Sequence, residues 1–286
     1  MSEKKKSDFG PRLLTAVVAI PLLLGIILAG PHWAFFALVA VAGAISAWEY
    51  CGITVGAELP ATRPLSGLLA AGVMVTAYFA PAHLNTALYA ALAIAFLFVL
   101  FFHREQPKAT NHLGAIITAV MYGGLMFVPL ALMRHDTGDG AGPLWVIMAL
   151  AIVWGSDTGA YFAGRAFGKH KLSPTVSPNK TIEGAIGSAI SAVGFALLFD
   201  QIYRATSPDA WVGLELWEAA LIALPANFLG QTGDLCESLI KRAHEVKDSG
   251  TIIYGHGGML DRIDALIFAS PWFYVFVTHF GTPPGA

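Results

Sequence analysis

Charged residues are scarce in this chain. Asp, Glu, Lys and Arg together make up 13% of its 286 residues, which is about half their share in an average soluble domain. So few charges would cover the surface of a soluble protein thinly. The composition therefore argues against a soluble enzyme, a disordered chain and a nucleic-acid binder with a broad basic face. Hydrophobic types reach 56%, which favours a polytopic membrane protein.

Cysteine is almost absent, and neither charge sign dominates. The chain has only Cys51 and Cys236, and their spacing matches no metal motif, so no disulfide framework is expected. The formal net charge of −2 indicates no particular class of partner.

Long apolar stretches are abundant, and each is close to the 20 or so residues that a membrane-spanning helix needs. Nine are found, at approximately 12–30, 33–50, 65–82, 84–102, 113–133, 144–163, 182–203, 214–235 and 263–280. We interpret the first as a retained signal anchor. Because lipid cannot satisfy a bare backbone, the sequence predicts an all-α polytopic transmembrane bundle of about nine spans. Helices within 1–140 would form a scaffold with dimer contacts, and 141–286 would form the catalytic site.

The distribution of Lys and Arg predicts the orientation. With a cytoplasmic N-terminus, fifteen of the seventeen cations fall on the cytoplasmic side, as the positive-inside rule requires. The two longest connections, 163–181 and 236–262, lie on that side and hold eight of these cations. Loops of that length in a compact protein are usually functional or disordered, so the chemistry is expected there.

Polar residues form a stripe along the eighth apolar stretch. Helical spacing places the following on one face: Asn227, Gln231, Asp234, Ser238 and Lys241. Hydrogen bonding between helices would account for Asn227 and Gln231. Asp234 needs a cation or a proton as well, which favours a functional role. Asp157, in the sixth stretch, is either functional or interfacial, and the small residues around it favour close helix packing.

A second group lies where the 163–181 connection meets the next helix. Thr181 is a predicted N-cap. Lys180 beside that helix N-terminus would make a corner that attracts anions.

The segment 234–264 is the most densely charged part of the chain. It interleaves carboxylates with cations, and the glycines Gly257 and Gly258 permit close backbone approach to a phosphate. Carboxylates hold divalent metals that bridge phosphate oxygens, and cations take the remaining phosphate charge. This pattern favours metal-assisted phosphate chemistry. His256 is either a phosphate donor or a turn residue.

At this point the sequence resembles the phosphatidate cytidylyltransferase (CDP-diacylglycerol synthase) family. The matching signature consists of Ser238, Lys241, Arg242, Lys247, Asp248, His256, Gly257, Gly258, Asp261, Arg262 and Asp264. Upstream matches are Asp157, Tyr161, Gly164, Arg165, Gly168, Lys169, Ser177-Pro178, Lys180-Thr181 and Glu183-Gly184. Tyr254 departs from the family, which usually has Pro or Gly there. The motifs cover roughly 150–280.

The resemblance implies that CTP and phosphatidate give CDP-diacylglycerol and pyrophosphate. It also implies Mg²⁺ as cofactor, and it leaves a second metal ion open. It implies that dCTP is used as well as CTP, that the protein forms a homodimer, and that nucleic acid is not a partner. We assign Asp234, Asp248, Asp261 and Asp264 to the metal, and the last three also to catalysis with Lys241 and Arg262. Substrate binding falls to Asp157, Lys180, Ser238, Arg242, Lys247, His256, Gly257 and Gly258. The expected location is a bacterial inner membrane, with the site facing the cytoplasm.

Two other classes remain open on sequence alone. An ion-coupled transporter would also use intramembrane acids, but it has no evident need for four clustered cations. The second class is a different lipid-phosphate enzyme, such as a polyprenol kinase or a CDP-alcohol phosphotransferase. The Asp-Gly-x-x-Ala-Arg start of the latter is absent from this sequence.

Overall fold

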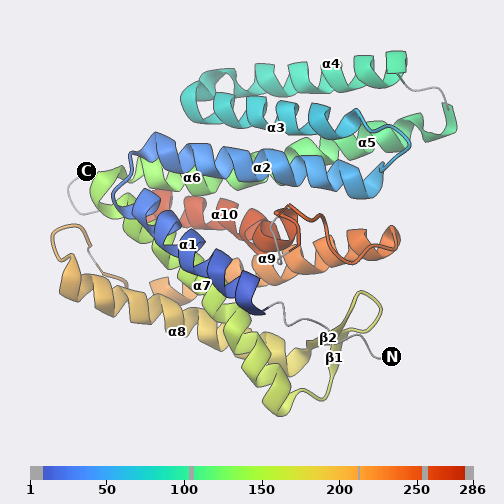
Figure 1. The fold of residues 1–286 in the computed structure, drawn as a ribbon. Helices are drawn as coiled ribbons and strands as arrows, with labels where there is room; N and C mark the ends of the chain where they lie inside the picture. The colour runs from blue at the N-terminus through green and yellow to red at the C-terminus, as the bar shows by residue number, and fades with distance from the viewer. Residues whose placement is uncertain (1–8, 103–105, 212, 253–256, 281–286) are drawn as a thin grey trace.

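The computed structural model describes residues 9–102, 106–211, 213–252 and 257–280. Within these ranges the first half of the chain forms six α-helices, joined by short 3₁₀ and π-helical turns (Figure 1). They are α1 (Phe9–Leu28), α2 (His32–Thr54), α3 (Thr62–Phe79), α4 (Leu84–Phe102), α5 (Ala109–Ala119) and α6 (Val128–Asp136). The turns are η1 (Pro81–His83), η2 (Gln106–Lys108), η3 (Val120–Gly124) and η4 (Leu125–Phe127).

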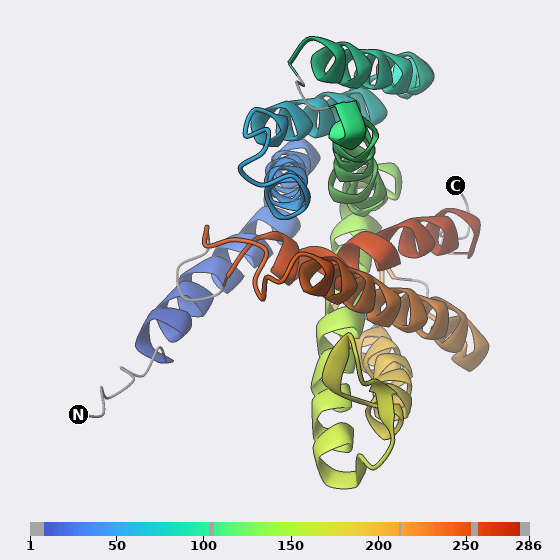
Figure 2. The same ribbon diagram turned by 90° about the vertical axis from the view of Figure 1, so that its right-hand side faces the viewer.

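The second half of the described chain contains four longer helices and one hairpin. The helices are α7 (Gly138–Phe167), α8 (Ile182–Thr206), α9 (Leu216–Ala243) and α10 (Leu260–Phe280). Strands β1 (Lys171–Ser173) and β2 (Ser177–Thr181) pair antiparallel, with Lys171 opposite Thr181. This hairpin lies at one end of the α7–α8 pair, far from α4 (Figure 2).

The all-α prediction is confirmed, since each predicted apolar stretch lies on helix. Six helical segments are long and apolar enough to cross a membrane: α2, η1 with α4, α5 through α6, α7, α8 and α10. The chain is therefore an integral membrane protein. The count of nine spans stays a prediction, because α1, α3 and α9 do not meet that criterion among the described residues. In α9 the reason is the polar stripe itself.

The helices are arranged in layers (Figure 1). Helix α3 packs along α2 on one side, and α9 packs along α10 in the middle. The most extensive packing among the described helices is between α7 and α8, as their small residues predict. A Cβ atom added to Gly155 would collide with the ring of Phe195, and one added to Gly159 would collide with Ser191. The interpretation of these glycines as packing residues is confirmed.

The two long connections are shorter than predicted. Helix α9 continues to Ala243, so Ser238, Lys241 and Arg242 lie on the helix and not in a loop. Cations in the last turn of a helix interact favourably with its dipole, which explains this extension. The connection 163–181 is likewise occupied by the end of α7 and the hairpin.

Candidate functional site

A cavity of about 500 Å³ opens between α7, α8, α9 and the hairpin. Its size is typical of a ligand-binding pocket. The charged and amide side chains that line it are Asp157 and Arg165 from α7, Asn179 and Lys180 from β2, and Gln231 and Asp234 from α9. Residues from three predicted groups, far apart in the sequence, thus meet around one space.

Lys180 and Asp234 form an ion pair across this cavity, with 2.6 Å between Nζ and Oδ2. The hairpin holds Lys180 in place from two sides. Thr181 caps α8 by accepting a hydrogen bond from the Gly184 N–H at 3.1 Å, so the predicted N-cap is confirmed. Glu183 accepts hydrogen bonds from the backbone N–H groups of Lys169 and His170, which fixes the entry to the hairpin.

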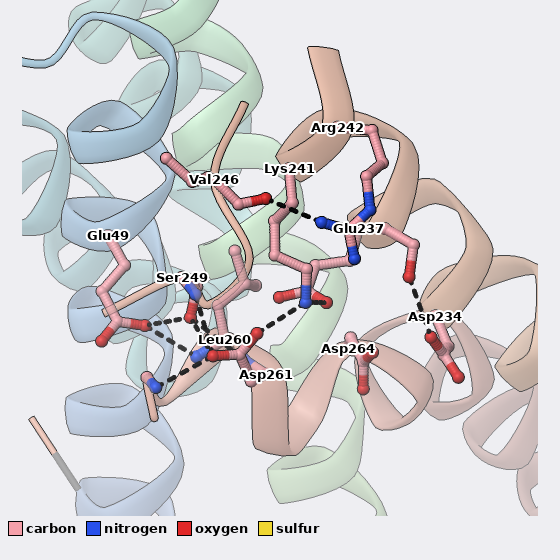
Figure 3. A network of polar contacts seen from close by, with 12 residues as sticks. Glu49, Asp234, Glu237, Lys241, Arg242, Val246, Ser249, Leu260, Asp261 and Asp264 are labelled. Atoms are coloured by element: carbon pink, nitrogen blue, oxygen red, sulfur yellow. Dashed lines mark hydrogen bonds and ion pairs between the residues drawn. The ribbon is translucent and has the colours of Figure 1, made fainter. Parts of the chain in front are cut away.

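Three carboxylates from three helices lie within electrostatic range of one another at the crossing of α7, α9 and α10. The charge of Asp234 repels those of Asp157 and Asp264, and the charge of Asp157 repels that of Asp264. Figure 3 shows Asp234 and Asp264 on neighbouring helices α9 and α10. Lys180 is a cation near Asp157 and Asp234, and Lys241 is a cation within electrostatic range of Asp264. The group therefore carries more negative than positive formal charge, which suits a divalent cation bound together with phosphate.

The polar stripe on α9 splits into a structural part and a site part. Asn227 donates a hydrogen bond to Ser188 Oγ on α8 at 2.6 Å, and Gln231 donates to Asn227 at 2.7 Å. These contacts fit the interpretation as hydrogen bonding between helices. Further along, Ser238 donates to Asp234 Oδ1 at 3.4 Å, so Ser238 helps to orient the carboxylate in the cavity.

Lys241 lies in a buried cluster of charges (Figure 3) and does not line the cavity. Its ammonium group pairs with Glu237 one turn earlier on α9 and with Asp261 Oδ1 on α10 at 2.6 Å. Glu237 and Lys241 are both buried. Because two carboxylates surround one ammonium group, this cluster contains more carboxylate than one cation can neutralise. Glu237 Oε1 has no hydrogen-bond partner in the described part of the chain.

Asp261 also organises the loop before α10. Its Oδ2 accepts hydrogen bonds at 2.9 Å from the Ser249 N–H, the Ser249 hydroxyl and the Gly258 N–H. Gly257 has a positive φ of 85°, and a Cβ added to Gly258 would lie under 3.0 Å from Ser249 and Glu49. Both glycines are thus required by the turn, and the Gly258 N–H points at Asp261.

Glu49 was missed by the sequence analysis. It is a fully buried residue of α2, and its carboxylate accepts hydrogen bonds from the Met259 N–H at 3.1 Å and the Leu260 N–H at 2.8 Å. It also lies 3.1 Å from the Ser249 hydroxyl oxygen, whose one proton Glu49 and Asp261 share. It therefore satisfies N–H groups at the start of α10 that the helix itself leaves unpaired. A lone acid near the end of the apolar stretch 33–50 was the available signal.

The remaining predicted residues lie nearer the surface. Arg242, Lys247, Asp248 and Arg262 are exposed, and Arg242 donates a hydrogen bond to the Val246 carbonyl at 3.1 Å. His256 and Tyr254 lie outside the described residues. Among the residues described, no group of three or more His, Cys, Asp or Glu side chains is placed so that it could hold a metal ion. Cys51 and Cys236 are free thiols.

Comparison with known proteins adds the family. A model of the cytidylyltransferase family matches residues 10–280. A phosphatidate cytidylyltransferase of Bacillus subtilis (strain 168) is 31% identical over 277 residues, 96% of this chain and 99% of the relative. One from Pseudomonas aeruginosa is 35% identical over 272 residues, covering 92% of this chain and 94% of that one. A Brucella suis protein of the same name is 40% identical over 164 residues, 57% of each chain. The chain therefore belongs to the cytidylyltransferase family.

Proposed function

We propose that the chain transfers a cytidylyl group from CTP to phosphatidate, which yields CDP-diacylglycerol and pyrophosphate for phospholipid synthesis. The observation that carries this proposal is the cavity where Lys180 meets Asp157 and Asp234, beside Asp264. The names of the relatives support the two substrates. The family match favours nucleotidyl transfer over the transporter and over the other lipid-phosphate enzymes.

In the proposed reaction, an ionised phosphate oxygen of phosphatidate attacks the α-phosphorus of CTP. A new P–O bond forms, and the bond from the α-phosphorus to the bridging oxygen of the β-phosphate breaks. Pyrophosphate leaves with that electron pair. Because the attacking oxygen is already ionised near neutral pH, the protein needs no strong general base. Its task is to position the reactants and to stabilise charge.

Mg²⁺ would be held by Asp234 and Asp264, with Asp157 nearby. Mg²⁺ commonly takes one or two carboxylates and completes its shell with substrate phosphates and water, so an incomplete protein ligand set fits it. When bound, it would supply charge neutralisation on the triphosphate. Asp261 fits this role less well, since its oxygens already accept hydrogen bonds from Lys241, Ser249 and Gly258. Asp248 is exposed.

The cations divide the phosphate charge in this proposal. Lys180 lines the cavity from the hairpin and would neutralise the triphosphate, helped by the exposed Arg242 and Lys247. We further propose a site that faces the cytoplasm of a bacterial inner membrane, use of dCTP as well as CTP, and a homodimer. The one-sided distribution of cations supports the orientation.

One assay tests the reaction. The purified chain in detergent, given labelled CTP, phosphatidate and Mg²⁺, is expected to release pyrophosphate and to move the label into lipid. Unchanged lipid would overturn the proposal. Asp264→Ala is expected to insert and fold but to lose transfer, and near-normal turnover would reject its assignment. Lys180→Met is expected to lower kcat/KM, whereas Lys171→Met, an exposed lysine of the same hairpin, serves as the control.

A further inference from the structure

A second cavity, of about 400 Å³, lies between α1, α2, α7 and the start of α10. Side chains such as Leu23, Leu38, Val39 and Leu150 line it, and its walls are apolar except at one point. The exception is Arg262, the one charged residue among the described residues that line this space. A guanidinium group at an apolar cavity fits an anionic amphiphile, since neither a free nucleotide nor a plain hydrocarbon has both features.

The first turns of α10 separate this cavity from the acidic site. Met259, Ile263 and Leu266 face the apolar cavity. Asp261, on the opposite side of the same turn, pairs with Lys241 of α9, and Asp264 lies in range of Asp234. Arg262 follows Asp261 directly in the chain. A phosphate held by Arg262 would therefore lie at the same turn of α10 that carries Asp261 and Asp264.

We propose that this cavity is the binding site for the lipid substrate, with acyl chain in the apolar space and the lipid phosphate at Arg262. The inference rests on the proposed function, because it names where the second substrate of that reaction binds. The positive charge of Arg262 complements the lipid phosphate, and the apolar walls complement the acyl chain. The site assigns a substrate-binding role to α1 and α2, in the half of the chain that was expected to form a scaffold.

The expected selectivity follows from the surrounding solvent. Lipid tails are as apolar as the side chains of the cavity. The acyl chain of the substrate therefore gains little free energy when it moves from the bilayer into the cavity. What the cavity supplies is a defined position for the lipid, with its phosphate at the turn of α10 that also carries Asp261 and Asp264. Filling the cavity should therefore act by exclusion, and it should penalise long acyl chains more than short ones.

The test compares Trp substitutions on two helices. Ala19→Trp and Leu38→Trp place a bulky ring at the cavity from α1 and α2, at positions where the native side chains are exposed. Val18→Trp places the same ring on α1 at a residue that does not line the cavity and is 60% exposed. Kinetics are measured with CTP and either dioleoyl- or dihexanoyl-phosphatidate, after each variant is shown to elute as a monodisperse peak in detergent.

The cavity variants are expected to raise KM for dioleoyl-phosphatidate about tenfold or more, with a smaller change for the dihexanoyl lipid and an unchanged KM for CTP. Val18→Trp should match the wild type. Arg262→Ala should raise KM for both lipids, and Arg262→Lys should recover part of the loss. Unchanged lipid KM in both cavity variants would overturn the inference while the function stands. A change in thermal stability alone would indicate a structural lipid and would also overturn it. A wild type without transfer would reject the proposed function itself.

Discussion

Lys241 and Arg242 are neighbours in the sequence, and the structure predicts opposite consequences for their loss. The side chain of Lys241 is 11% exposed and pairs with Glu237 and Asp261, which are 2% and 9% exposed. Lys241→Met would leave two buried carboxylates facing each other without a cation. Breaking a buried ion pair by removing one partner costs about 3–5 kcal/mol. Arg242 is exposed, so Arg242→Met is expected to cost less than about 1 kcal/mol.

Thermal unfolding in detergent, followed by fluorescence-detected size exclusion, measures the difference. A loss of this size corresponds to a fall of roughly 10 °C in the midpoint for a chain of this length, and the Arg242 variant should fall by only a few degrees at most. The double variant Glu237→Met/Lys241→Met should recover part of the loss, because it removes one of the two unpaired acids. Equal midpoints for Lys241→Met and Arg242→Met would refute the view that the charge cluster stabilises the fold.

Three further predictions concern the loop before α10 and the metal. Glu49→Ala leaves the N–H groups of Met259 and Leu260 unpaired, at about 1–3 kcal/mol each, and thermal unfolding should show it less stable than Glu49→Gln; equal midpoints would contradict this. Gly258→Ala should lower the midpoint, because no space exists for a Cβ atom. In Gly72→Ala, on α3, the added Cβ would have nothing within 4 Å, so the free energy of unfolding should stay the same or rise by up to about 1 kcal/mol. Chelation with EDTA should abolish transfer and added Mg²⁺ should restore it, and activity that survives chelation would reject the metal.

The sequence predicted well those features that depend on local rules. The stripe on α9 follows from helical spacing, and the cap at Thr181 follows from residue type. The pairing of Lys180 with Asp234 could not be predicted, since it joins a hairpin to a helix more than fifty residues later and depends on how α8 packs.

An acidic residue in an apolar stretch can have a catalytic or binding role, or it can stabilise the fold. The sequence alone does not distinguish these two roles. Asp200 is a buried acid within α8, and its carboxylate accepts hydrogen bonds from Trp211 Nε1 and the Leu214 N–H. It holds the connection to α9 and lies outside the site. Glu49 has a similar local sequence context but bonds to the loop before α10. Only the partners distinguish the two, and partners are a property of the tertiary fold.

The Glu49 contacts also limit how this chain can be recombined with its relatives. They join residues 200 to 211 positions apart, so the loop that ends at α10 is not held by its own half of the molecule alone. A hybrid that combined residues 1–140 of one relative with the remainder of another would need a carboxylate from the incoming α2 at this point. The two halves would therefore be inherited together, and changes at position 49 and in 249–260 would be expected to occur in concert.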